Sequence, residues 1–347
     1  MKTLDVTSAG GTYPVYVGRG ILKDPEALAK YLPFGKRKVL VVTDDGVPSD
    51  YTRAVLSVCP EGEIVTLPAG EGTKSLSSFE LLLSRMLDAG FTRSSAVCAV
   101  GGGVVGDLSG FAAACYMRGI DFYNLPTTML SMVDSSVGGK TAIDFHGTKN
   151  TVGAFYPPRA VLIDCDVLKT LPARQMSAGL AEAVKMALTS GATFFSLFEN
   201  ETLPAWEEIV LRSVAIKAKI VGEDEKEAGL RKLLNFGHTL GHAIEAAEGL
   251  SGLLHGECVA LGMLPMCSPA VRKRLLPILD RLGLPTAFPK DTDRMFSYLT
   301  YDKKRAGDKI SAVFVDEVGK GYLRDTTIDA LCERVTEYLA STEGETK

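Results

Sequence analysis

The chain has 347 residues and a net charge of −4; 46% of its residues are hydrophobic and 23% are charged. These values are typical of soluble globular proteins and exclude general disorder, and the slight excess of acid disfavours a nucleic-acid binder, which needs a basic surface. At roughly 100–200 residues per domain, the length predicts two domains. No apolar run approaches the roughly 18 residues that span a bilayer, and the opening MKTLDVTSAG lacks the apolar core of a signal peptide.

The seven cysteines are scattered along the chain and show no CxxC spacing. An odd number without paired spacing indicates reduced thiols and no cysteine zinc site. Together with the lack of a targeting signal, this predicts a cytoplasmic protein.

Strand and helix signals alternate in the first half of the chain. The apolar run Lys38–Thr43, which ends at Asp44, predicts a buried parallel strand. A capping box that starts at Ser77 predicts a helix ending at Gly90. Further strands are predicted at Glu63–Leu67, Ser95–Val100 and Ala160–Ile163. This alternation favours a parallel sheet with helices on both faces.

Beyond about residue 172 the pattern becomes mostly helical. A hairpin is predicted from Ile310–Val315 and Tyr322–Arg324, and a last helix from Thr327–Leu339. Apolar residues at 3.6-residue spacing predict helices at Arg174–Leu188, Glu207–Val221, Arg231–Glu248, Glu257–Met266 and Ala270–Leu282. The predicted fold class is therefore α/β, with a Rossmann-like parallel-sheet domain over residues 1–172 and a mostly α-helical domain over 173–347. A cleft between two such domains is a preferred ligand site.

Gly101, Gly103 and Gly106 form a GxGxxG pattern directly after a predicted strand and before an apolar helix. Glycines at these positions let backbone N–H groups approach a pyrophosphate at the helix N-terminus. A tight turn that binds nothing is the alternative, and the motif follows the third predicted strand rather than the first. The strand–turn–helix context favours a dinucleotide site.

A polar segment between residues 134 and 150 is a second candidate for anion binding. It contains GKT, as a phosphate loop does, but Asp134 stands where the GxxxxGK pattern needs glycine, which disfavours a P-loop NTPase. So many donors among small residues suit an anionic ligand, with a solvated loop as the alternative. The polar residues are Asp134, Ser135, Ser136, Lys140, Thr141, Lys149 and Asn150.

Three of the four histidines, His238, His242 and His255, fall within 18 residues of one another. His238 and His242 are four residues apart, so a helix places them on one face, and His255 follows on a predicted loop. With an acid from elsewhere they would make a divalent-metal site, although the spacing is not the HExxH of zinc proteases. Coincidence of core and surface histidines is the alternative, and spacing leaves open which two or three would bind metal.

Glu182 and Lys185 lie three residues apart in an alanine-rich helical segment. They could form a surface ion pair of small energy, or a buried pair that would be costly without a ligand. Lys217 and Arg231, taken singly, read as solvated charges on helices.

Six blocks, in the same order and over nearly the whole chain, resemble the 3-dehydroquinate synthase family. The family is related to glycerol and iron-dependent alcohol dehydrogenases and to other sugar-phosphate cyclases. The blocks are GEGTKS (70–75), GGGVVGDLSGFAAACYMRGI (101–120), PTTMLSMVDSSVGGKTAIDFHGTKN (126–150), TLPARQMSAGLAEAVK (170–185), GLRKLLNFGHTLGHAIE (229–245) and HGECVALGM (255–263).

The resemblance implies a homodimeric enzyme that converts 3-deoxy-D-arabino-heptulosonate 7-phosphate to 3-dehydroquinate and phosphate in the shikimate pathway. It implies NAD bound by the N-terminal domain and regenerated in each turnover, and a divalent metal, zinc or cobalt. The implied steps are transient oxidation by NAD, phosphate elimination, re-reduction and an intramolecular aldol closure.

The resemblance also implies a role for individual residues. It makes Glu182, His238 and His255 the metal ligands and places His242 near the substrate instead, unlike a chelate formed by His238 and His242. The implied substrate residues are Arg118, Asp134, Lys140, Asn150, Lys185, Lys217, Arg231, Asn235 and His242, with Lys304 or its neighbour Lys303 near the phosphate. The implied NAD residues are Asp44, Glu71, Lys74, Gly102, Gly103, Val104, Asp107, Thr127, Thr128, Lys140, Lys149 and Thr170.

Three alternatives differ from this interpretation. Another sugar-phosphate cyclase would share most of the motifs. A metal-dependent polyol dehydrogenase would share the two-domain plan, but its metal acid is usually aspartate, where this chain has Glu182. An inactive dinucleotide-binding regulator would have a broken ligand set, whereas Glu182, His238, His255 and Lys140 are all present.

Overall fold

The computed structural model describes residues 1–8, 10–249, 252–289, 292–306 and 309–344, without the side chains of 301–306 and 342–344. The chain divides into two compact units, one formed by Met1–Pro172 with Ala205–Glu225, the other by Ala173–Pro204 with Lys226–Lys347. The predicted boundary at residue 172 is where the first segment ends. Helix α7 (Trp206–Glu223) lies further along the chain, in the part that the sequence assigns to the second domain. It belongs to the first unit because it packs against β1 (Lys2–Ser8).

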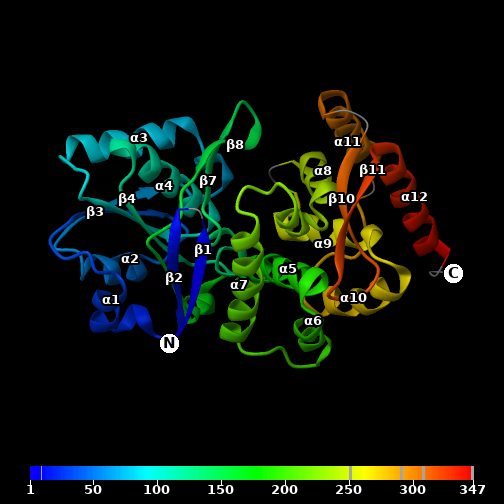
Figure 1. The fold of residues 1–347 in the computed structure, drawn as a ribbon, viewed down its shortest axis with the longest axis horizontal. Helices are drawn as coiled ribbons and strands as arrows, with labels where there is room; N and C mark the ends of the chain where they lie inside the picture. Colours follow the sequence, from blue (N-terminus) through cyan, green and yellow to red (C-terminus); the bar gives the residue numbers. More distant parts are fainter. Residues whose placement is uncertain (9, 250–251, 290–291, 307–308, 345–347) are drawn as a thin grey trace. The chain divides into compact units, whose positions relative to one another are not determined.

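The first unit is built on a seven-stranded sheet with the order β1-β2-β9-β6-β5-β3-β4 (Figure 1). Its pairs from β2 to β4 are parallel, and only the edge strand β1 is antiparallel to its neighbour. The strands besides β1 are β2 (Gly11–Gly18), β3 (Lys38–Asp44), β4 (Glu61–Leu67), β5 (Ala96–Gly101), β6 (Asp121–Pro126) and β9 (Ala160–Asp164).

Helices cover both faces of this sheet, as the sequence predicts. Alternate residues of β3 point to opposite sides, so that Leu40 packs into one apolar core and Val41 into the other. Helices α3 (Leu76–Asp88) and α4 (Gly103–Cys115) contribute to the first core, and α1 (Pro25–Tyr31) and α2 (Ser49–Leu56) to the second (Figure 1). The continuous apolar run of β3 is therefore explained by burial on both faces.

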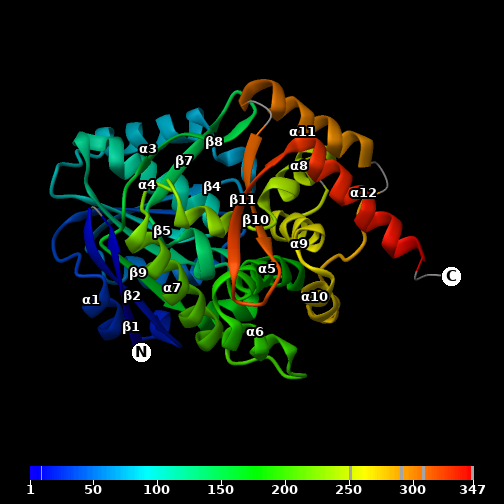
Figure 2. The same cartoon turned by 45° about the vertical axis from the view of Figure 1, so that its right-hand side comes forward.

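The second unit is mostly helical and carries the predicted hairpin of β10 (Lys309–Val315) and β11 (Gly321–Thr327) (Figure 2). Its helices are α5 (Ala173–Ser190), α6 (Ala192–Glu199), α8 (His238–Glu248), α9 (His255–Met266), α10 (Pro269–Arg281), α11 (Thr292–Ala306) and α12 (Ile328–Gly344). The predicted combination of a Rossmann-like sheet domain and a helical domain is confirmed. Among the described residues, no helix combines the length and apolar character needed to cross a membrane.

Three sequence predictions about local structure are wrong. The helix expected over Arg231–Glu248 is a 3₁₀ turn, η6 (Leu230–Asn235), followed by α8. The break lies at Gly237, whose φ is +76° and whose added Cβ would lie 2.7 Å from the carbonyl oxygen of Val259. His255, expected on a loop, is the first residue of α9, and α3 has Ser75 rather than Ser77 as its N-cap.

The polar segment 134–150, for which a solvated loop is the alternative to an anion site, is largely ordered structure in the first unit. A π-helical turn, η4 (Ser131–Ser135), leads into a hairpin of β7 (Lys140–Phe145) and β8 (Thr148–Phe155). Most residues of β8 are exposed, so the hairpin has little of the apolar alternation by which strands are recognised.

Candidate functional site: a metal-ligand cluster and a strand-end cluster

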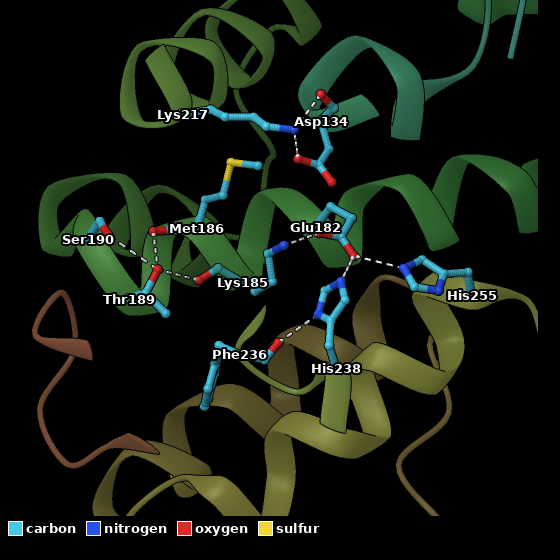
Figure 3. Close-up of polar contacts among 10 residues, drawn as sticks. All are labelled: Asp134, Glu182, Lys185, Met186, Thr189, Ser190, Lys217, Phe236, His238 and His255. Atoms are coloured by element: carbon cyan, nitrogen blue, oxygen red, sulfur yellow. Dashed lines mark hydrogen bonds and ion pairs between the residues drawn. The ribbon is translucent and has the colours of Figure 1, made fainter. Parts of the chain in front are cut away.

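In the second unit, side chains from three helices bring ligand atoms together. One ligand atom each of Glu182 on α5, His238 on α8 and His255 on α9 lies within 4.8 Å of the other two. Oε1 of Glu182 is 3.7 Å from Nε2 of His238 and 3.6 Å from Nε2 of His255 (Figure 3). One carboxylate oxygen and two imidazole nitrogens form a ligand set that suits zinc or a related divalent ion.

The environment of Glu182 fits a bound cation. Its side chain is completely buried, and Nζ of Lys185, one turn further along α5, lies 2.5 Å from its Oε2 (Figure 3). Apart from this ion pair and the two imidazoles, neither carboxylate oxygen has a hydrogen-bond partner within the described part of the chain. Buried carboxylates normally have such partners. The residues present therefore fit a metal ion.

Burial and nearby charges shift the pKa values of the three cluster residues in different directions. Burial raises the pKa of Glu182, but the positive charges beside it, that of Lys185 first, outweigh burial and hold that pKa well below its usual range. Burial, with the charge of Lys185, lowers the pKa of His238 to about 3. Burial also lowers the pKa of His255, but the carboxylates of Glu182 and Glu245 outweigh it and raise that pKa to about 9. In the metal-free protein, His238 and Glu182 are therefore unprotonated, whereas His255 carries a proton that a metal would replace.

Both histidines direct the same ring nitrogen toward Glu182. Nδ1 of His238 lies 3.2 Å from the carbonyl oxygen of Phe236, and Nδ1 of His255 lies 3.3 Å from Oε2 of Glu245. An acceptor at Nδ1 holds the proton on that atom and leaves the Nε2 lone pair for a metal.

The His-Gly-Glu sequence at 255–257 is explained by the packing of α9 on α5. A Cβ on Gly256 would lie 1.9 Å from the carbonyl oxygen of Ala178, so only glycine permits this approach. Glu257 accepts a hydrogen bond from the backbone N–H of Leu254 and forms a two-pronged ion pair with Arg174 of α5, both N–O distances being 2.7 Å. These contacts hold the start of α9, and with it His255, against the helix that carries Glu182.

Gly256→Ala is expected to destabilise the protein by about 3 kcal/mol or more. Overpacking a core usually costs about 1–3 kcal/mol. Here the added Cβ would clash with the backbone carbonyl of Ala178, which cannot move away as a flexible side chain could. Urea unfolding with metal removed measures the effect. Gly72→Ala is the control, because an added Cβ there has no heavy atom within 4 Å. Equal stability of the two variants would contradict the packing argument.

The structure brings the three clustered histidines together but places His238 and His242 in different groups of ligand-type atoms. The ring centroid of His242 lies 5.4 Å from that of His238 and 5.7 Å from that of His255, and its side chain is exposed. His242 falls in a second group of ligand-type atoms with Glu245 and His255, not in the group that contains Glu182. The geometry thus selects His238 and His255 as partners of Glu182.

In the first unit, candidate NAD residues follow three neighbouring strands. Asp44 ends β3, Gly102 follows β5 and caps α4, and Thr127 follows β6. Because β3, β5 and β6 are adjacent and parallel, their carboxyl ends meet at one edge of the sheet, where such folds bind nucleotides. Gly103 and Val104 form the first turn of α4, a 13-residue helix, as the glycine pattern predicts.

Beside this edge, a buried lysine joins residues from three separate segments. Lys74 is 5% exposed, its Nζ lies 2.5 Å from Oδ2 of Asp107, and it also donates to Oδ1 of Asn150. Burial outweighs Lys74 and raises the pKa of Asp107. Nearby in sequence, Lys149 lies 3.9 Å from Glu71. Four predicted NAD residues therefore form two ion pairs, and the predicted substrate residue Asn150 accepts a hydrogen bond from the lysine of one of them.

Other predicted substrate residues have varied surroundings. Lys217, from α7, is buried and donates to the side chain and the backbone carbonyl of Asp134 on η4, so it is not a solvated charge (Figure 3). In the second unit Arg231 is 2% exposed on η6, while the exposed Asn235 donates to Glu227.

The remaining predicted residues are less closely tied to these groups. Lys140 is exposed at the start of β7, and Arg118 is exposed on η3 (Tyr116–Arg118) with φ +67°. Thr128, after β6, is half-buried, and Thr170 is exposed and hydrogen-bonded to Tyr51 at 2.9 Å. The side chains of Lys303 and Lys304 lie outside the described residues.

Two residues that act on the cluster carry no prediction from sequence. Arg174 reaches Glu257, and Glu245 reaches His255. The one available signal was for Glu245, which follows His238 by seven residues and so lies on the same helical face.

Comparison with known proteins relates this chain to one enzyme family. Family models described as 3-dehydroquinate synthase N-terminal and C-terminal match residues 64–178 and 179–305. A 3-dehydroquinate synthase of Methylococcus capsulatus is 41% identical, with 97% of this chain and 98% of that protein covered.

Two solved structures of other cyclases have similar folds. The structure of 2-deoxy-scyllo-inosose synthase with carbaglucose-6-phosphate, NAD⁺ and Co²⁺ has a TM-score of 0.84 at 27% identity, covering 97% of this chain and 99% of that one. The 2-epi-5-epi-valiolone synthase of Streptomyces hygroscopicus, with NAD⁺ and Zn²⁺, has a TM-score of 0.83 at 29% identity, covering 95% and 97%. With two matching family models and a curated relative at 41% identity, this chain belongs to the 3-dehydroquinate synthase family.

Proposed function

We propose that this protein converts 3-deoxy-D-arabino-heptulosonate 7-phosphate to 3-dehydroquinate and phosphate. The observation that carries the proposal is the buried Glu182 with His238 and His255 at ligand distance, inside sequence blocks of that family. Identity is 41% to a curated 3-dehydroquinate synthase, against 27% and 29% to cyclases that form other products. The difference favours the dehydroquinate reaction over another sugar-phosphate cyclisation.

The proposal assigns a metal to the second unit and NAD to the first. When bound, the metal supplies Lewis-acid polarisation of substrate oxygens, and NAD supplies a reversible hydride acceptor. Glu182, His238 and His255 hold the metal, which is zinc or cobalt, the ions that accompany NAD⁺ in the two cyclase structures. The proposed NAD residues are the strand-end set Asp44, Glu71, Lys74, Gly102, Gly103, Val104, Asp107, Thr127, Thr128, Lys140, Lys149 and Thr170.

The phosphate and carboxylate of the substrate require fixed cationic donors. Lys185, Lys217 and Arg231 are nearly fully buried, so their orientation is held before any ligand arrives. Because these cationic groups are already fixed in place, binding an anion to them costs little further conformational entropy of the side chains. The proposal adds as substrate contacts Arg118, Asp134, Lys140, Asn150, Asn235, His242 and one of Lys303 and Lys304.

The wild-type protein is expected to release phosphate far in excess of the NAD supplied, without accumulating NADH. The net reaction neither gains nor loses electrons, so NAD is needed only in catalytic amount. The test mixes protein, the heptulosonate phosphate, a trace of NAD and zinc or cobalt, while phosphate and the NADH absorbance band are followed. Identification of dehydroquinate as the product completes it.

Two results would overturn the proposal. Absence of phosphate release with metal and NAD bound would exclude this substrate. NADH formation from glycerol or another polyol would instead identify a dehydrogenase. The homodimer that the family resemblance implies is part of the proposal, and light scattering of the purified protein tests it.

A further inference from the structure

Glu245 connects two helices at the metal-ligand cluster. It lies on α8, seven residues after His238, and its Oε2 is 3.3 Å from Nδ1 of His255 on α9. On the other side of the same ring, Nε2 of His255 is 3.6 Å from Oε1 of Glu182. The two nitrogens of His255 therefore face two different carboxylates, one completely buried and one half-buried.

The two histidines of the cluster are oriented by acceptors of different charge. His238 has the neutral carbonyl oxygen of Phe236 at Nδ1, whereas His255 has a carboxylate there. A carboxylate acceptor makes a stronger hydrogen bond and increases the electron density at Nε2. His255 also has more need of such a partner, because its side chain is 33% exposed against 13% for His238. Packing alone holds the ring of His255 less firmly.

We infer that Glu245 is a positioning residue for the metal centre: it accepts the Nδ1 hydrogen of His255 and holds Nε2 toward the metal position. The inference rests on the proposed function, which places a metal at this cluster. The competing role is direct ligation, because Glu245, His242 and His255 also bring ligand-type atoms within 4.8 Å of one another. The two roles predict different metal stoichiometries, one ion per chain for positioning and two for ligation.

The test compares Co²⁺ binding by wild-type protein, Glu245→Gln and Glu245→Ala, without substrate or NAD. Affinity is measured by competition with a chelator, stoichiometry by metal analysis, and ligand geometry by the visible absorption bands of Co²⁺. Loss of an outer-shell partner usually weakens metal binding 10–100-fold. We expect about tenfold weaker binding for the glutamine variant, which keeps an acceptor oxygen without the charge. For the alanine variant we expect a loss approaching 100-fold with altered absorption bands.

Glu248→Gln is the matched control. Glu248 is exposed on the same helix, and its substitution removes the same charge as Glu245→Gln does. It is expected to bind Co²⁺ as the wild type does. Thermal unfolding of the metal-free proteins shows whether each variant folds. If Glu245→Ala does not fold, the comparison of Glu245→Gln with the wild type is the test.

The inference would be overturned if Glu245→Gln and Glu245→Ala both bound Co²⁺ with the affinity and the absorption bands of the wild type. It would also be overturned by two ions per wild-type chain with one lost in Glu245→Ala, because Glu245 would then be a ligand. Metal binding by the wild type without phosphate release would contradict only the proposed function. A wild type that binds no metal would contradict both.

Discussion

His255→Ala is expected to lose its bound metal and its phosphate release while it still folds and binds NAD. Among the residues that the structure describes, three protein ligands converge at the cluster, so removing one leaves a two-ligand site. Activity is expected to fall by at least 10²–10³-fold, roughly the scale of losing one preorganised electrostatic group. The side chain is 33% exposed, so its removal costs little packing. Metal analysis, the phosphate assay and a fluorescence titration with NADH measure the three properties.

His242→Ala is the matched comparison for this prediction. His242 lies on the same helix as His238 but outside the group that contains Glu182. The variant is expected to keep its metal and lose activity, because we place His242 at the substrate. A His255→Ala protein that still binds metal and releases phosphate would contradict the assignment of His255 as a metal ligand. Loss of metal from His242→Ala but not from His255→Ala would reverse it.

Lys185→Met is expected to destabilise the metal-free protein by about 3–5 kcal/mol, and added metal is expected to restore much of that loss. Glu182 and Lys185 are 0% and 1% exposed, and removing one member of a buried pair leaves an uncompensated charge. A divalent ion at Glu182 supplies positive charge in place of the lysine. Binding at 100 times the dissociation constant contributes about 2.7 kcal/mol to the bound state. Urea unfolding with chelator and with Zn²⁺ measures both effects.

Glu182→Gln is the partner variant, and it is expected to behave differently. It leaves Lys185 buried without a counter-charge and removes a metal ligand. Added metal is therefore not expected to restore the lost stability. The double variant is expected to be more stable than either single variant, because neither charge is then left alone. Lys185→Met with wild-type stability in chelator would show that the lysine is not needed to balance Glu182. A stability loss that Zn²⁺ leaves unchanged would place the metal elsewhere.

How far the fold was predictable depends on how strongly each segment's burial is patterned along the chain. The strand β3 is recognisable because its residues are buried on both faces of the sheet, and α5 because its apolar spacing is regular. The hairpin of β7 and β8 escaped prediction because β8 is mostly exposed. The break before α8 escaped because it arises from the close approach of α9 to Gly237, a contact between segments separated in sequence.

The sequence by itself determined the family, the alternation of strand and helix, and the types of residue available for a metal and a dinucleotide. Those properties reside in local patterns and in blocks of adjacent residues. The family resemblance implied Glu182, His238 and His255 as ligands, but only the tertiary structure showed how they meet. It also showed that Glu245 contacts His255 and that Arg174 pairs with Glu257 at the start of the same helix. The ligands come from three helices whose approach depends on contacts such as that of Gly256 with Ala178. Burial then sets the charge state of each ligand, because the cost of burying a charge depends on what packs around it and not on its neighbours in sequence.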